Sequence, residues 1–251
     1  MSLKTPLFVL VGRALQLFGR RWALFVAVTA VAIGAEGLVV LLWHSAQAIL
    51  FANSIFIPLQ TAIIYAFVAA DSLAEPVKPS RTWARALERA WAVIVIDFIE
   101  TLVQIWGAPA DGADPLAIVL NVVTILIVVT LVFADAAAVI DDEGEGGGNA
   151  VLRGLMLVPR SLVRSVTLVL VGGFVIRAFF LFGLEIATEF LSVGAGLAFH
   201  ALHAGGADFW AQCAIPTLAT APIAVATAVF YIDAEEFESS LGGDAEDDAS
   251  A

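Results

Sequence analysis

Residues 149–180, NAVLRGLMLVPRSLVRSVTLVLVGGFVIRAFF, decide the fold because a basic segment continues directly into an apolar one. The first half places Arg153, Arg160 and Arg164 at spacings of seven and four residues, which puts the three side chains on one face of a helix. The second half carries a single basic residue, Arg177. We interpret the stretch as an interfacial helix that turns into a membrane span.

The composition is that of an integral membrane protein. Of 251 residues, 61% are hydrophobic and 14% are charged, and the mean hydropathy is +0.95, far from the values of a soluble domain. The formal net charge is −12, and the basic residues are ten arginines and two lysines. Such a chain suits a cytoplasm with molar salt, where charges are screened to a range of roughly 3 Å. We expect a halophilic source; an acidic tail on an ordinary bacterial protein is the alternative.

The chain lacks residues that several functional classes require. Cys213 is the only cysteine, which excludes an internal disulfide and a cysteine-based metal cluster within one chain. Lys4 and Lys78 lie outside the apolar runs, which excludes a retinal protein. A nucleophile elbow, HExxH, a P-loop and GxGxxG are all absent. We therefore expect no enzymatic activity, no cofactor and no nucleic-acid partner.

Six apolar runs approach or exceed the length that crosses about 30 Å of hydrocarbon. We expect an all-α, polytopic membrane protein with about six transmembrane helices and three cytoplasmic amphipathic helices. Pro58 in the second run and Pro216 and Pro222 in the sixth are expected to bend their helices. The runs cover about residues 22–43, 48–70, 90–106, 115–140, 165–190 and 209–232.

Basic amphipathic segments precede alternate spans, at 2–21, 71–89 and 149–164. Eleven of the twelve basic residues lie in 1–21, 71–89 and 141–164. By the positive-inside rule, both termini and these helices are cytoplasmic in a multi-pass protein of the cell membrane. Each basic residue near anionic lipid contributes about 1 kcal/mol, so we expect lipid-headgroup contacts. The expected contact residues are Arg13, Arg20, Arg21, Arg81, Arg85, Arg89, Arg153, Arg160 and Arg164.

The basic segments also indicate an internal repeat. The pattern R-x-L-x-L-x-x-R occurs at 13–20 and at 153–160, and 85–89 is a looser match. A three-fold repeat of 1–70, 71–140 and 149–232 would fill a single helical membrane domain, 1–232; chance leucine and arginine content is the alternative. We expect residues 233–251 to form a disordered, acidic cytoplasmic tail.

Among the charged residues of the apolar runs, we expect an intramembrane charge cluster of Glu36, Asp97, Glu100 and Arg177. At 1.5 Å per residue, Glu100, Arg177 and Glu36 reach depths of roughly 15, 18 and 21 Å from the cytoplasmic side. They are expected to meet near the midplane, either as a structural ion pair or as a proton or ion pathway, with lipid-headgroup or water-cavity roles as further readings. Near the outer surface, Glu189, His200 and His203 are weak candidates for a metal site, and no metal is expected because their spacing fits no known motif.

The segment ADAAAVIDDEGEGGGNAVLRGLMLVPRSLVRSVTLVLV, residues 134–171, resembles the membrane domain that precedes some bacterial glycerophosphodiester phosphodiesterases and its stand-alone, haloarchaeal-type relatives of uncharacterised function. Residues 230–233, FYID, resemble the closing signature of that family, although Glu235, Glu236 and Glu238 replace the arginines that usually follow. The resemblance implies a helical membrane domain without assigned catalytic residues. The phosphodiesterase segment itself is absent.

These patterns predict a membrane-organising subunit that binds lipids or a protein partner, either a second copy of the chain or another membrane subunit. A small-solute or ion transporter that uses the intramembrane carboxylates and Arg177 is the alternative. An intramembrane enzyme is a third interpretation.

Overall fold

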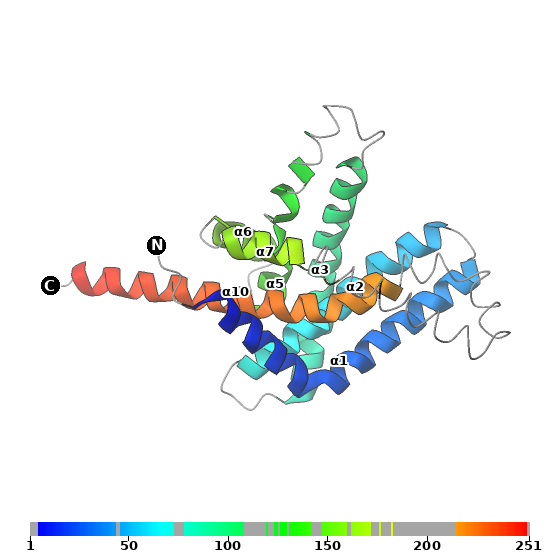
Figure 1. The fold of residues 1–251 in the computed structure, drawn as a ribbon, viewed down its shortest axis with the longest axis horizontal. Coiled ribbons are helices and arrows are strands. Elements are labelled where there is room, and N and C mark those ends of the chain that lie inside the picture. The colour runs from blue at the N-terminus through cyan, green and yellow to red at the C-terminus, as the bar shows by residue number, and fades with distance from the viewer. Residues whose placement is uncertain are drawn as a thin grey trace.

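The computed structural model describes residues 5–43, 46–72, 78–107, 131–141, 147–159, 162–171 and 214–249, and short pieces at 119, 123–124, 126–129, 176 and 182. Every regular element in these residues is a helix (Figure 1). Three of the helices are long and apolar enough to cross a membrane, within Leu7–Trp43, Ala48–Ser72 and Ile215–Glu236. The chain is therefore all-helical where it is described, and its helices are compatible with a membrane protein.

Helix α1 (Leu7–Trp43) contains the first basic segment and the first apolar run, with a kink between them. The kink is at Arg21, whose φ of −115° and ψ of 17° are not helical. Arg21 Nε and Nη2 donate to Asp71 Oδ2 and Oδ1 at 2.8 and 2.5 Å, respectively. The expected junction between surface helix and span thus coincides with a kink that is anchored to the end of α2.

Helices α1, α2 (Ala46–Ser72) and α10 (Ile215–Ala249) pack against one another (Figure 1). Pro58 lies inside α2 and Pro222 inside α10. Helix α3 (Pro79–Gly107) joins the second basic segment to the third apolar run without interruption, because neither proline nor glycine occurs between its ends.

Three short helices lie against this group: α5 (Ala134–Ile140), α6 (Gly147–Leu157) and α7 (Leu162–Leu170). Helix α5 is built almost entirely of small residues that are fully buried, so that α2, α3, α6 and α10 all contact it. A Cβ atom on Gly154 of α6 would lie 2.8 Å from the Ala134 backbone. Glycine therefore permits the direct backbone approach of α6 to α5.

The C-terminal part of the chain differs from expectation. Helix α10 continues to Ala249, and Asp233 and Ala234 are buried. Helix α10 thus passes through the expected boundary at Asp233. The physical reason is that no proline follows Pro222, and arginines of α1 and α6 offset the buried acidic charge. Part of the fourth expected span and most of the fifth lie outside the described residues.

Candidate functional site

A cluster of polar side chains lies in the apolar contact between α1, α2 and α10. Helix α1 contributes Thr29 and Glu36, which are two turns apart and share one face. Helix α2 contributes Gln60, and α10 contributes Thr217. All four are buried, and the exposed fraction of Glu36 is 0%. We call these four residues the buried polar cluster.

Hydrogen bonds connect the buried polar cluster across all three helices. The Thr217 hydroxyl donates to Glu36 Oε1 and Oε2 at 2.7 and 2.8 Å. The Gln60 amide nitrogen donates to Thr29 Oγ1 at 2.8 Å and to the Thr217 backbone oxygen at 3.2 Å. Glu36, Thr217, Gln60 and Thr29 therefore form one continuous chain of contacts.

The polar groups of this cluster are only partly satisfied within the described part of the chain. There, Gln60 Oε1 is buried and accepts no hydrogen bond, and the Glu36 carboxylate forms no ion pair with a basic side chain. A buried charge without an opposite charge costs several kcal/mol. An ionised Glu36 would therefore be costly in a purely structural contact.

Sequence reasoning identified part of this cluster. Glu36 was predicted as an intramembrane charge, and its hydrogen-bond partner among the described residues is Thr217, not Asp97. Asp97 lies half-buried on α3. The predicted meeting of Glu36, Glu100 and Arg177 stays a prediction, because the Glu100 side chain and Arg177 lie outside the described residues.

Thr29 and Thr217 were not predicted, because threonine is common in membrane helices. The available signal was the seven-residue spacing of Thr29 from Glu36, which places both on one helical face. No pattern in the sequence indicates that Thr217 would meet that face.

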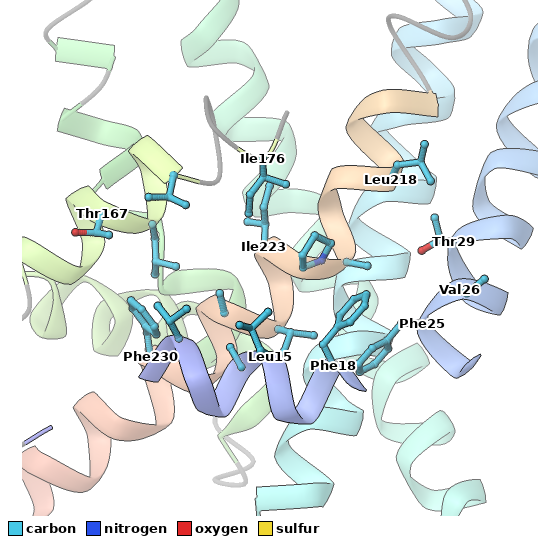
Figure 2. Close-up of a pocket in the computed structure, with 18 of the residues that line it drawn as sticks. Leu15, Phe18, Phe25, Val26, Thr29, Thr167, Ile176, Leu218, Ile223 and Phe230 are labelled. Carbon is cyan, nitrogen blue, oxygen red and sulfur yellow. The ribbon is translucent and has the colours of Figure 1, made fainter. Parts of the chain in front are cut away.

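Beside the cluster lies an apolar cavity of about 780 Å³ between α1, α7 and α10. Figure 2 shows side chains from these helices pointing into it, including Leu15, Phe18 and Phe25 of α1 and Phe230 of α10. The cavity spans the kink of α1, so residues from both halves of that helix line it. Thr29 belongs to both the cavity wall and the buried polar cluster.

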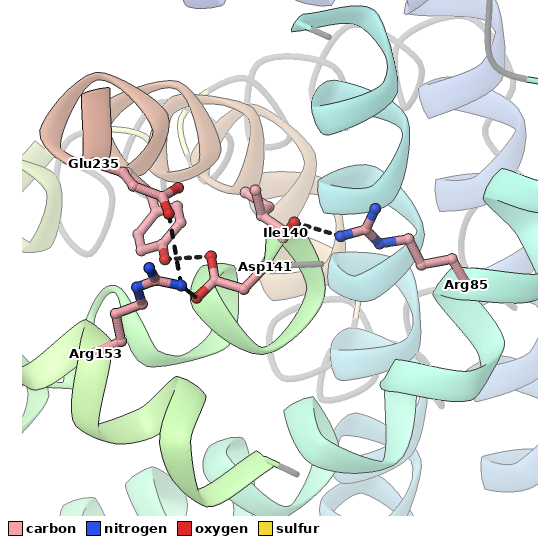
Figure 3. Close-up of polar contacts among 6 residues, drawn as sticks. Arg85, Ile140, Asp141, Arg153 and Glu235 are labelled. Atoms are coloured by element: carbon pink, nitrogen blue, oxygen red, sulfur yellow. Dashed lines mark hydrogen bonds and ion pairs between the residues drawn. The ribbon is translucent and has the colours of Figure 1, made fainter. Parts of the chain in front are cut away.

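A second polar group, the ionic cluster, surrounds Asp141 at the end of α5 (Figure 3). Tyr231 donates its hydroxyl to Asp141 Oδ1 at 2.6 Å, and Arg153 Nη1 donates to Asp141 Oδ2 at 3.2 Å. Arg153 also lies 3.8 Å from Glu235 Oε1. Burial lowers the pKa of Arg153, but the carboxylates of Asp141 and Glu235 more than offset this, and the pKa is raised overall.

Other arginines of the basic segments also contact the protein. Arg85 Nε donates to the Val139 carbonyl at 2.9 Å, and Arg85 Nη2 donates to the Ile140 carbonyl, which caps the end of α5. Arg13 lies 3.9 Å from Asp233 Oδ1. Three acids, Asp71, Asp141 and Asp233, thus bind arginines, and each directly follows an expected span.

The remaining residues predicted for lipid or metal binding are exposed, half-buried or outside the described residues. Arg20 and Arg81 are exposed and Arg89 is half-buried, so their expected contacts with lipid headgroups stay predictions. Among the described residues, no group of three His, Cys, Asp or Glu side chains is placed to hold a metal ion. Several predicted residues lie outside the described part of the chain, at least in their side chains: Arg160, Arg164, Glu189, His200 and His203.

No protein-family model, curated protein or solved structure matches this chain.

Proposed function

We propose that this chain is a multi-pass protein of the cell membrane that binds lipid in its apolar cavity and organises the membrane around it. The observation that carries the proposal is the cavity between α1, α7 and α10. Its volume of about 780 Å³ falls within the range of roughly 300–1,000 Å³ that is typical of ligand pockets. Its lining suits a hydrocarbon chain, because almost all of the side chains in it are apolar.

The composition of the lining argues for a lipid rather than for a polar solute. Thr29 and Thr167 supply the only side-chain hydroxyls among the described lining residues. Each CH₂ group that leaves water contributes about 0.8 kcal/mol, so an acyl or isoprenoid chain gains most from such a surface. A polar solute would lose its hydration without gaining hydrogen bonds.

The basic segments place cationic groups beside this apolar lining. Ala14 and Phe18 line the cavity, and Arg13 and Arg20 lie on either side of them in the first half of α1. The side chain of Arg13 is 55% exposed although it pairs with Asp233. In this proposal, these arginines bind the anionic headgroup of the lipid.

The proposed architecture has six spans, with both termini and the three basic segments in the cytoplasm. The long apolar helices and the charge distribution of the chain support it. The acids Asp71, Asp141 and Asp233, each at the end of an expected span and each bound to an arginine, support the proposed three-fold repeat. Ion or small-solute transport is the alternative function, and the buried polar cluster is the observation that favours it.

A matched pair of substitutions on α1 tests lipid binding. Ala30 lines the cavity and Ala27 does not, although both are exposed on the same helix. Ala30→Trp should lower the amount of lipid that stays with the protein after mild detergent purification, measured by mass spectrometry. Ala27→Trp should retain the wild-type amount. Equal lipid content in the two variants, or a wild-type protein that retains no lipid, would contradict the proposal.

A further inference from the structure

The buried polar cluster contains more oxygen acceptors than the described residues satisfy. Its oxygen atoms come from the Glu36 carboxylate, the Gln60 amide, the Thr29 hydroxyl, and the Thr217 hydroxyl and carbonyl. They belong to three helices and lie in a region from which the surrounding side chains exclude water. Hard cations are bound in proteins by oxygen ligands of these types.

We infer that the buried polar cluster is a binding site for one monovalent metal cation, with Glu36 as its charged ligand. A single positive charge would neutralise the one carboxylate of the cluster and offset the cost of burying it. It would also give Gln60 Oε1, which accepts no hydrogen bond among the described residues, an electropositive partner. This inference does not rest on the proposed lipid site, although Thr29 of the cluster also lines that cavity.

The charge of the cluster argues against a divalent ion. Protein sites for calcium use six to eight oxygen ligands, usually with several carboxylates. Here Glu36 is the only carboxylate that the described contacts bring into the cluster. A divalent ion would leave an uncompensated positive charge in an apolar region.

Protonation of Glu36 is the competing explanation, because a proton also removes the buried charge. It explains the contacts of Glu36 equally well, because a hydroxyl has a single hydrogen and a protonated carboxyl can donate to Thr217 Oγ1. A proton on Glu36 still leaves Gln60 Oε1 without a hydrogen bond among the described residues. A metal cation accounts for the carboxylate and for the amide oxygen together.

The backbone carbonyl of Leu218, the residue after Thr217, lacks its usual helical donor. Pro222 lies inside α10 and has no N–H group to donate to the carbonyl of Leu218, four residues earlier. In hydrocarbon, a freed carbonyl requires another partner. Interrupted helices whose free carbonyls coordinate small cations occur at the midplane of membrane transporters.

The test is the thermal unfolding of the purified full-length protein in sodium chloride and in choline chloride at equal ionic strength. Sodium should raise the midpoint to a plateau, and calorimetric titration with sodium should show one saturable site. Glu36→Gln should weaken sodium binding by about tenfold or more, since it removes the charged ligand. Asp97→Asn, which removes a carboxylate from another expected span, should leave the sodium effect unchanged.

Gln60→Met provides a second test of sodium binding if Glu36→Gln fails to fold. Methionine removes the buried amide oxygen while it keeps an unbranched side chain. The variant should remain folded in choline chloride and lose much of its stabilisation by sodium. The same midpoint for the wild-type protein in both salts would overturn the inference and favour a protonated Glu36. Full sodium dependence in Glu36→Gln would also overturn it.

Discussion

Tyr231 donates a hydrogen bond of 2.6 Å to Asp141, across ninety positions of sequence, and so joins α10 to the end of α5. The other oxygen of the Asp141 carboxylate accepts a hydrogen bond from Arg153 of α6. The Asp141 side chain is only 8% exposed. One carboxylate therefore holds three helices together at the expected cytoplasmic surface.

Tyr231→Phe should destabilise the protein by about 1–3 kcal/mol, because it leaves a buried carboxylate oxygen without its donor. The measurement is the free energy of unfolding in one detergent, compared with that of the wild-type protein. The double variant with Arg153→Met should show coupling, since both residues bind Asp141. An unchanged free energy of unfolding for Tyr231→Phe would contradict a structural role for this contact.

The ion pair between Arg21 and Asp71 should contribute less to the free energy of unfolding than the hydrogen bond between Tyr231 and Asp141, although its geometry is good. The Arg21 side chain is 44% exposed, and exposed ion pairs contribute about 0–1 kcal/mol. Asp71→Asn should therefore lower the free energy of unfolding by less than about 1 kcal/mol, and high salt should reduce the difference. A loss as large as that expected for Tyr231→Phe would show that the kink of α1 depends on this pair.

Gly154→Ala should destabilise the protein by about 1–3 kcal/mol, the usual effect of an added methyl group in a packed region. The added Cβ would lie 2.8 Å from the Ala134 backbone, and backbone atoms cannot move aside easily. Gly12→Ala is the matched control on α1, where a Cβ meets nothing within 4 Å. It should stabilise the helix by up to about 1 kcal/mol, because alanine favours helix more than glycine does. Equal effects of the two substitutions on the unfolding midpoint would refute the close approach of α6 to α5.

The proposed orientation predicts the activity of reporters fused along the chain. Green fluorescent protein should fluoresce when fused after residue 76 or 145, and it should not fluoresce when fused after residue 111. A reporter that is active only outside the cytoplasm should show the reverse pattern. Cytoplasmic activity of a fusion after residue 111 would overturn the orientation, because it would place an expected outer loop on the basic side.

The sequence was informative about helices because helix formation is a local property. The apolar run 48–70 corresponds closely to α2, and the junction expected at residue 22 coincides with the kink at Arg21. Both follow from hydropathy and from the placement of charged residues along the chain. Helix α10 continues past the boundary expected at Asp233, where an acidic residue is easily read as solvent-exposed when its arginine partner is distant in sequence.

The contacts of the candidate sites depend on tertiary structure, which periodicity does not specify. Arg85 was assigned to lipid headgroups from its helical face, and the structure places its guanidinium on the carbonyl groups at the end of α5. Thr217 carries no charge and matches no motif, yet it contacts Glu36 across 181 positions. Which helices become neighbours decides these contacts.

The proposed function requires a lipid chain in the cavity between α1, α7 and α10. The most direct measurement is photo-crosslinking with a lipid that carries a diazirine near the end of its acyl chain, followed by peptide mass spectrometry. Crosslinks are expected on cavity residues such as Phe25 and Phe230, and they should be lost in Ala30→Trp. Crosslinks confined to outward-facing residues such as Leu42 and Phe98, with none in the cavity, would contradict it.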